Sequence, residues 1–301
     1  MGRAFHHDYR RKCTYHITIK KHPDMPPFGF LAGKLPSVYI SRSALGQVIV
    51  RNIAAIPSLN PNLKVLQYIV IPDHIHFLLK VCDTLDLHLG NYIGMFKVNI
   101  FQDYAAQTGV RHPVFEDDFY DCILYPSRSL DAIFQYIRDN PRRLAERREN
   151  PGFFQRVNDL VIDGHHCQAY GNIQLLANPF KDQVVVHRAD TPEQRESHRQ
   201  QWLYTSANGG VLVSPFISPA EKAIREEAEA ADGRFILLTG EPFGERYKPS
   251  GHLFELCCAG RLLVLSGASL TGPVGRNLTR PQCLALNSLA AAVAAMPQPG
   301  Y

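Results

Sequence analysis

The first eighty residues of the chain alternate between strand-like and helix-like patterns of apolar positions. Residues 15–20 alternate apolar with polar side chains and are rich in β-branched residues, which predicts a strand. The Gly- and Pro-rich stretch 23–37 predicts a loop, and apolar residues at helical spacing over 43–56 predict a helix. Strands are predicted over 65–71 and 74–81, and the tight turn between them predicts a hairpin.

The pattern then returns to helical spacing. Residues 85–108 predict a second helix, and 121–125 predict a short fourth strand. A third helix is predicted over 129–148, with Ser129 as its N-cap. The order β-α-β-β-α-β followed by a helix is the ferredoxin-like split pattern. We therefore expect an α+β domain over residues 1–150.

The second half of the chain shows a different order of elements. Residues 151–205 lack a regular period and carry charged tracts, so we expect a linker or extension there. Over 206–301, short apolar runs alternate with helical segments that begin at capping boxes. The strands are predicted at 210–214, 235–239 and 261–266, and the capping boxes at Ser218 to Glu221 and Thr279 to Gln282. This order favours a smaller, Rossmann-like α/β domain.

The role of residues 206–301 is not fixed by any motif. The Gly209-Gly210 pair and the helix start at Ser218 are typical of places where a phosphate can bind. The glycine fingerprint of a dinucleotide site is absent, however. A module for packing or dimerisation is the preferred interpretation.

Composition and charge restrict the classes of protein further. A chain of 301 residues with 45% apolar and 20% charged side chains is typical of a folded globular protein, and its length favours two domains. Residues 1–150 carry 19 Lys and Arg against 14 Asp and Glu, whereas the remainder carries 13 against 14. The basic excess of the first half favours a polyanionic partner such as nucleic acid.

The cysteines and the apolar runs favour a cytoplasmic location for the protein. The seven cysteines are scattered without a CxxC pair, which argues against a disulfide framework or a cysteine zinc site and is typical of a reducing cytosol. The polar, basic start has no apolar core of a signal peptide, and the longest apolar runs are too short to span a bilayer. We therefore expect a cytoplasmic protein without a membrane partner.

Two histidines mark the start of the strand predicted over 74–81. In the stretch IPDHIH, His74 and His76 project from one face of the strand while Ile75 and Phe77 project from the other. Two neutral imidazoles at such positions form half of a site for a divalent metal ion. The alternative is that both histidines cover a solvated sheet face.

A tyrosine and an asparagine share one face of the third predicted helix. Tyr136 and Asn140 are four residues apart, so their side chains lie one turn from each other. A tyrosine hydroxyl is a candidate nucleophile, and an amide oxygen is a hard metal ligand. The alternative is that Tyr136 packs in the core and that Asn140 ends the helix before Pro141.

Taken together, four motifs resemble a known family. HIH after Pro72-Asp73, a basic helix with Lys97, the segment FEDDFYD and the helical segment YIRDNP resemble the REP-associated tyrosine transposases, members of the single-tyrosine HUH superfamily, in order and spacing. The resemblance covers residues 13–148. Where members of the family often read WQ, this chain has Phe115-Glu116, which leaves details of substrate recognition open.

The resemblance implies a reaction and the residues that perform it. Tyr136 would attack a phosphodiester of single-stranded DNA, beside a hairpin, and form a 5′-phosphotyrosine link. His74, His76 and Asn140 would hold Mg²⁺ or Mn²⁺, which neutralises the phosphate oxygens. The phosphates of the DNA would be contacted by Lys97, Arg138, Arg142 and Arg143.

Other interpretations stay open beside a metal-dependent DNA strand transferase. One is a DNA-binding or regulatory protein that derives from a transposase and has lost turnover, and in either case the basic helix end can be a solvated one. A histidine-dependent nucleotide phosphoesterase would need a second HxH-like element, which the sequence lacks. The resemblance also leaves open whether Tyr136 acts in its own subunit or across a homodimer.

Overall fold

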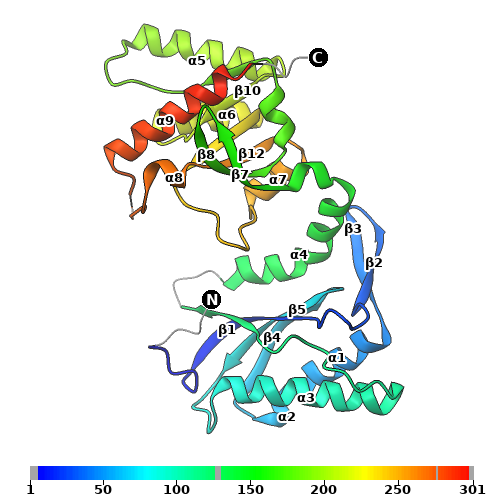
Figure 1. The fold of residues 1–301 in the computed structure, drawn as a ribbon. Helices are drawn as coiled ribbons and strands as arrows, with labels where there is room; N and C mark the ends of the chain where they lie inside the picture. The colour runs from blue at the N-terminus through cyan, green and yellow to red at the C-terminus, as the bar shows by residue number, and fades with distance from the viewer. Residues whose placement is uncertain (1–5, 126–129, 276, 298–301) are drawn as a thin grey trace. The chain divides into compact units, whose positions relative to one another are not determined.

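The computed structural model describes residues 6–125, 130–275 and 277–297, and the chain divides into two compact units, Met1–Glu146 and Arg147–Tyr301 (Figure 1). Both units combine helices with β-sheet, so the mixed α and β class expected from the sequence is confirmed. Each unit has its own sheet and its own core. No helix within the described ranges combines the length and the apolar character that a membrane crossing requires.

Unit 1 is built on a four-stranded antiparallel sheet with the order β4-β5-β1-β6. Its strands are β1 (Cys13–Lys20), β4 (Leu63–Val70), β5 (His74–Val81) and β6 (Tyr120–Leu124). Its helices are α1 (Ala44–Ala54), α2 (Ile56–Leu59), α3 (Leu89–Thr108) and α4 (Leu130–Glu149). Strands and main helices follow the β-α-β-β-α-β order expected from the sequence, with α4 after the last strand. The predicted N-cap Ser129 lies outside the described residues.

One face of this sheet carries the main core of unit 1. Ile17 of β1 and both Ile75 and Phe77 of β5 are fully buried there, because alternate positions on neighbouring strands share a face. Apolar residues of α1 and α3 complete the core. The hydroxyl of Ser43 begins α1 by accepting a hydrogen bond from the amide of Gly46.

Helix α4 packs on the opposite face of the sheet. Leu78 of β5, Leu124 of β6 and Ile137 of α4 form a small buried cluster between them. The alternation along β5 turns His74 and His76 to this same face. The sheet and α4 therefore bring the histidines and the face of the third predicted helix together.

A hairpin replaces the loop that the sequence predicts over 23–37. Strand β2 (Gly29–Lys34) pairs with β3 (Ser37–Arg42) as a separate two-stranded sheet. At Gly29 an added Cβ would lie 2.6 Å from the Ile40 side chain and 2.7 Å from a backbone oxygen, so glycine permits the close pairing. Sequence reasoning missed the hairpin because its Gly and Pro residues are typical of loops.

Unit 2 contains a six-stranded sheet with the order β7-β8-β12-β11-β10-β9. Strands β9 (Lys181–Gln183), β10 (Val211–Ser214), β11 (Arg234–Thr239) and β12 (Leu262–Ser266) are parallel. Strand β8 (His165–Gly171) pairs antiparallel with β12, and β7 (Gln155–Ile162) pairs antiparallel with β8 at the edge of the sheet. Helices α5 (Pro192–Ala207), α6 (Pro219–Ala230) and α7 (His252–Cys258) pack on one face, and α9 (Arg280–Ala295) packs on the other. The remaining short helices are η1 (Pro151–Phe154), η2 (Ile173–Ala177) and α8 (Ala268–Thr271).

The expectation of a linker over 151–205 is wrong. This segment supplies β7, β8 and β9 to the sheet of unit 2, together with α5. Strand β8 reads HHCQAYG, which has no clear alternation, and it is held by main-chain pairing with β12, about 100 residues later. Its buried residues lie on both faces, Cys167 and Ala169 in one apolar cluster and Tyr170 in another, so no alternation of apolar and polar positions marks this strand in the sequence.

Both capping boxes predicted in unit 2 are confirmed. The hydroxyl of Ser218 accepts a hydrogen bond from the Glu221 amide, and Thr279 forms the same motif with Gln282. The carboxylate of Glu221 accepts hydrogen bonds from the amides of Ile217 and Ser218 at 2.8 and 2.9 Å. Glu221 is only 5% exposed. The start of α6, where the sequence permits a phosphate, therefore already holds a carboxylate.

Candidate functional site

The predicted histidine pair lies at the start of β5, on the face toward α4. The Nε2 atoms of His74 and His76 are 2.8 Å apart, and their rings are perpendicular, at 89°. His76 is buried, whereas the side chain of His74 is 24% exposed. Two Nε2 atoms that face each other at a partly open edge form an arrangement that a cation can bridge.

Each histidine of the pair is held from behind by a polar group. The carboxylate of Asp73 lies 2.8 Å from Nδ1 of His74. Thr18 stands directly opposite His76 in the β1–β5 register, and its hydroxyl lies 2.8 Å from Nδ1 of His76. A hydrogen bond to Nδ1 is what orients a metal-binding imidazole and leaves its Nε2 available.

A third histidine, His16, joins this network and was missed by sequence reasoning. Its Nε2 lies 3.1 Å from Nδ1 of His76, across the β1–β5 pair. Burial, with a smaller contribution from the charge of His74, lowers the pKa of His16 from 6.5 to about 4. His16 is therefore neutral at pH 7. Only the cross-strand register, which the sequence does not give, would have revealed it.

Tyr136 of α4 lies over these histidines. Its ring centroid is 5.9 Å from that of His76 and 6.1 Å from that of His16. Tyr136 is 37% exposed, and its hydroxyl makes no hydrogen bond with any described residue. The guanidinium of the buried Arg143 lies 5.4 Å from the centre of the tyrosine ring. The ring of Tyr136 thus lies near both a histidine cluster and a positive charge, and no described residue engages its hydroxyl.

Asn140 is buried on α4, one turn after Tyr136. The helix continues through Pro141 to Glu149, so the alternative in which Asn140 ends the helix is wrong. Pro141 has no backbone N–H to donate to the Ile137 carbonyl. The side-chain Nδ2 of Asn140 instead donates to the carbonyls of Tyr136, at 2.8 Å, and Ile137, at 3.5 Å. Within the described part of the chain no hydrogen bond joins Asn140 to either histidine, and its role as a metal ligand stays a prediction.

The predicted phosphate contacts differ in their surroundings. Lys97 donates to the backbone carbonyls of Glu116, Asp117 and Asp118 at 2.8, 2.8 and 3.1 Å, which uses all three hydrogens of its ammonium group. Arg142 forms a two-bond ion pair with Asp139 at 2.7 and 3.0 Å. Arg138 is exposed, and Arg143 lies beside Tyr136. DNA contact by these four residues stays a prediction.

No family model matches this chain. It is 21% identical over 159 residues to an uncharacterized protein of Haemophilus influenzae, an alignment that covers 46% of this chain and 86% of that protein. It is also similar to a solved structure described as "the REP associates tyrosine transposase bound to a REP hairpin", with 14% identity and a TM-score of 0.36 over 48% of this chain and 74% of the other. These likenesses are distant, so function is inferred from the side chains themselves.

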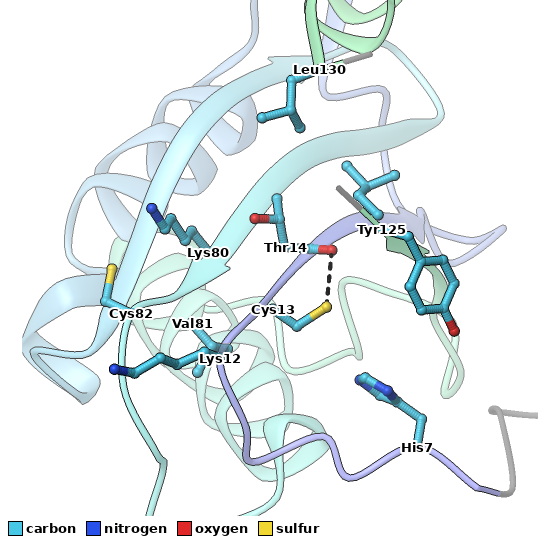
Figure 2. A pocket seen from close by; sticks show the side chains of 10 residues that line it. His7, Lys12, Cys13, Thr14, Lys80, Val81, Cys82, Tyr125 and Leu130 are labelled. Carbon is cyan, nitrogen blue, oxygen red and sulfur yellow. Dashed lines mark hydrogen bonds between the residues drawn. The ribbon is translucent and has the colours of Figure 1, made fainter. Parts of the chain in front are cut away.

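A cavity of about 770 Å³ continues the same face of the sheet away from the histidines (Figure 2). Thr14 and Lys80 are directly opposite each other in the β1–β5 register and stand on the face that carries His16 and His76. Figure 2 shows their side chains at the cavity. Its other polar and aromatic lining comes from His7, Lys12 and Tyr125. Two ammonium groups and an exposed aromatic ring therefore line the same cavity.

Proposed function

We propose that this chain cleaves and rejoins single-stranded DNA by a metal-dependent attack of Tyr136 on a phosphodiester. The observation that carries the proposal is the position of Tyr136 over the His74–His76 pair, with a hydroxyl that no described residue engages. A phenol that only packs in a core would bury its ring and satisfy its hydroxyl. Tyr136 instead keeps a partly exposed ring close to His76, and no described residue engages its hydroxyl.

The histidine pair has the donor chemistry that a divalent ion requires. Two imidazole nitrogens bound to one ion at about 2.1 Å are roughly 3 Å apart when they occupy neighbouring positions. The 2.8 Å between Nε2 of His74 and Nε2 of His76 fits this spacing with little movement. Asn140 would complete the site after a change of rotamer. Imidazoles suit Mn²⁺ or a later divalent ion better than Mg²⁺.

The proposed reaction uses the Tyr136 hydroxyl and an ion held by the histidine pair. A bound divalent ion would neutralise the non-bridging oxygens of the phosphate. The Oη atom of Tyr136 forms a bond to phosphorus, the bond from phosphorus to the 3′ oxygen breaks, and a free 3′-hydroxyl leaves. The partial exposure of Tyr136 lets its proton pass to water. One phosphodiester replaces another, so the 3′-hydroxyl can reverse the step and join strands without ATP.

The cavity beside the site fits the path of the single strand. Lys80 and Lys12 would contact successive phosphates, and the ring of Tyr125, which is 58% exposed, would stack on a base. Arg143 would contact the phosphate under attack from the side of α4. Positive groups thus lie at both ends of the proposed path.

The test is a covalent adduct between the protein and DNA. Wild type and Tyr136→Phe are incubated with end-labelled single-stranded hairpin DNA and Mn²⁺, and the mixture is separated on a denaturing gel. We expect label on wild-type protein, none on Tyr136→Phe and none with EDTA. Tyr204→Phe, which alters a 70% exposed tyrosine of unit 2, is the matched control and should keep the adduct.

A DNA-binding protein without turnover is the second candidate. It is favoured because only the two imidazole nitrogens are seen to converge, while the side-chain Nδ2 of Asn140 ties that residue to its own helix. This candidate predicts a gel shift with hairpin DNA and no adduct from either protein. An adduct that persists in Tyr136→Phe would contradict both candidates.

A further inference from the structure

A second group of metal-binding side chains lies in unit 1, outside the proposed DNA-cleaving site. His22 and Asp24 belong to the loop after β1, and His112 belongs to the segment after α3. The Asp24 carboxylate lies 3.7 Å from Nδ1 of His22 and 3.5 Å from Nε2 of His112. The two rings are 4.3 Å apart between centroids. All three ligand atoms lie within 4.8 Å of one another.

The hydrogen bonds of the two histidines turn lone pairs toward Asp24. Nδ1 of His112 lies 3.1 Å from the carbonyl of Pro113, which can only accept, so the proton is on Nδ1 and the Nε2 lone pair faces Asp24. Nδ1 of His22 accepts a long hydrogen bond, 3.3 Å, from the backbone amide of Asp24, so this nitrogen is unprotonated and an ion would replace that weak bond. Three electron-rich atoms therefore converge, an arrangement that a cation between them stabilises.

The backbone holds the two segments in place. The amide of His22 donates to the carbonyl of Val114 at 2.9 Å, and Lys21 forms a β-bridge with Phe115. The ammonium of Lys21 donates to the carbonyls of His22 and Pro23 at 2.7 and 2.9 Å. Ligands that are 90 residues apart in sequence are thus pre-positioned by main-chain contacts, which lowers the conformational cost of binding an ion.

We propose that His22, Asp24 and His112 bind a divalent transition-metal ion of the zinc class. Two imidazoles and one carboxylate are a common zinc ligand set, and ligands of a tetrahedral ion at about 2.0 to 2.1 Å are roughly 3.3 Å apart. The separations of 3.5 and 3.7 Å to Asp24 are close to this value, and the two ring nitrogens, which lie within 4.8 Å of each other, would approach on binding. Water fills the fourth position.

The ion ties the loop after β1 to the segment that leads into β6. The same loop contacts the turn before the candidate active site, because the Lys21 amide donates to the carbonyl of Asp73 at 2.9 Å. The site therefore stabilises the end of the sheet at which β5 begins with His74. It does not depend on the proposed DNA cleavage.

The test isolates this site from the His74–His76 pair. Untagged full-length protein with both His74→Ala and His76→Ala is dialysed against Zn²⁺, and bound metal is measured by mass spectrometry and by competition with a chelating dye. We expect one zinc ion per chain. Adding His112→Ala should weaken zinc binding by at least about 10-fold and remove the zinc-dependent rise in Tm.

Two further variants complete the test. Asp24→Asn keeps the shape of the side chain and removes its charge, so it should also lose zinc, and it replaces His112→Ala if that variant does not fold. His166→Ala is the matched control, because His166 pairs with Asp159 at 2.6 Å on the surface of unit 2, and it should keep full zinc binding. The proposal is overturned if the background variant binds no zinc, or if zinc binding survives in the foldable ligand variants.

Discussion

At the residue scale, the candidate site combines one pattern that the sequence carries with several that it does not. His74 and His76 share a face because of the two-residue period of a strand, and this is visible in the sequence. His16 enters only through the register of β1 against β5. His22 and His112 meet only because the loop after β1 pairs with the segment before β6. Local periodicity identifies faces, whereas contacts between distant segments require the fold.

Replacing Lys97 tests whether this lysine stabilises the fold or contacts a DNA phosphate. Replacing it with methionine removes three hydrogen bonds to the backbone of 116–118, and we expect a loss of about 1 to 3 kcal/mol in the free energy of unfolding. Chemical denaturation followed by circular dichroism measures this loss. The salt dependence of single-stranded DNA binding should stay the same, because the ammonium is already engaged.

Lys222→Met, on the exposed surface of α6, is the control and should change neither quantity by much. The structural role of Lys97 would be contradicted if Lys97→Met left stability unchanged and reduced the slope of log K against log salt by about one.

At the element scale, the pattern of apolar positions predicts buried strands well but misses polar strands at the edge of a sheet. Strand β5 has the bounds predicted from the sequence, His74–Val81, because Ile75, Phe77 and Leu79 occupy every second position and fill one buried face. Strand β7 has one buried residue, Ile162, and its remaining positions are partly or fully exposed. An edge strand is held mainly by backbone hydrogen bonds, which leave no pattern in its side chains.

Two helical glycines give opposite predictions for the same substitution. A Cβ at Gly94 of α3 would meet no atom within 4 Å, so Gly94→Ala should raise the free energy of unfolding by up to about 1 kcal/mol. A Cβ at Gly46 of α1 would lie 1.9 Å from the carbonyl oxygen of Phe28, so Gly46→Ala should lower it by about 1 to 3 kcal/mol. Denaturant midpoints of both variants measure the difference in sign. Equal effects would contradict the close packing of α1 against the Phe28 segment.

At the scale of the whole molecule, the two candidate sites and the basic excess lie in unit 1. All the residues of the candidate active site and of the proposed zinc site precede residue 147. The two apolar clusters of this unit consist of residues from unit 1, the last being Ile123 and Ile137. The sequence predicted two domains for the chain, and the roles assigned to them stay predictions.

A fragment of residues 1–149 should therefore fold by itself. We expect a cooperative thermal transition by circular dichroism and retention of the adduct-forming reaction. A fragment of residues 1–125 should lose both, because it lacks Tyr136 and exposes Leu78 and Leu124 on the face that α4 covers. A non-cooperative transition for residues 1–149 would mean that unit 1 needs unit 2 to fold.

The carboxylate of Glu221 at the start of α6 has a consequence for the partners of unit 2. A helix start normally attracts anions, because its free amides point outward. Here the Glu221 carboxylate occupies the amides of Ile217 and Ser218 and also accepts from the Val186 amide at 3.2 Å. A carboxylate of the helix itself therefore occupies the place that an external anion would take. The amides of Ile217 and Ser218 are therefore not available to an external anion, and this helix start is a poor place for a phosphate to bind.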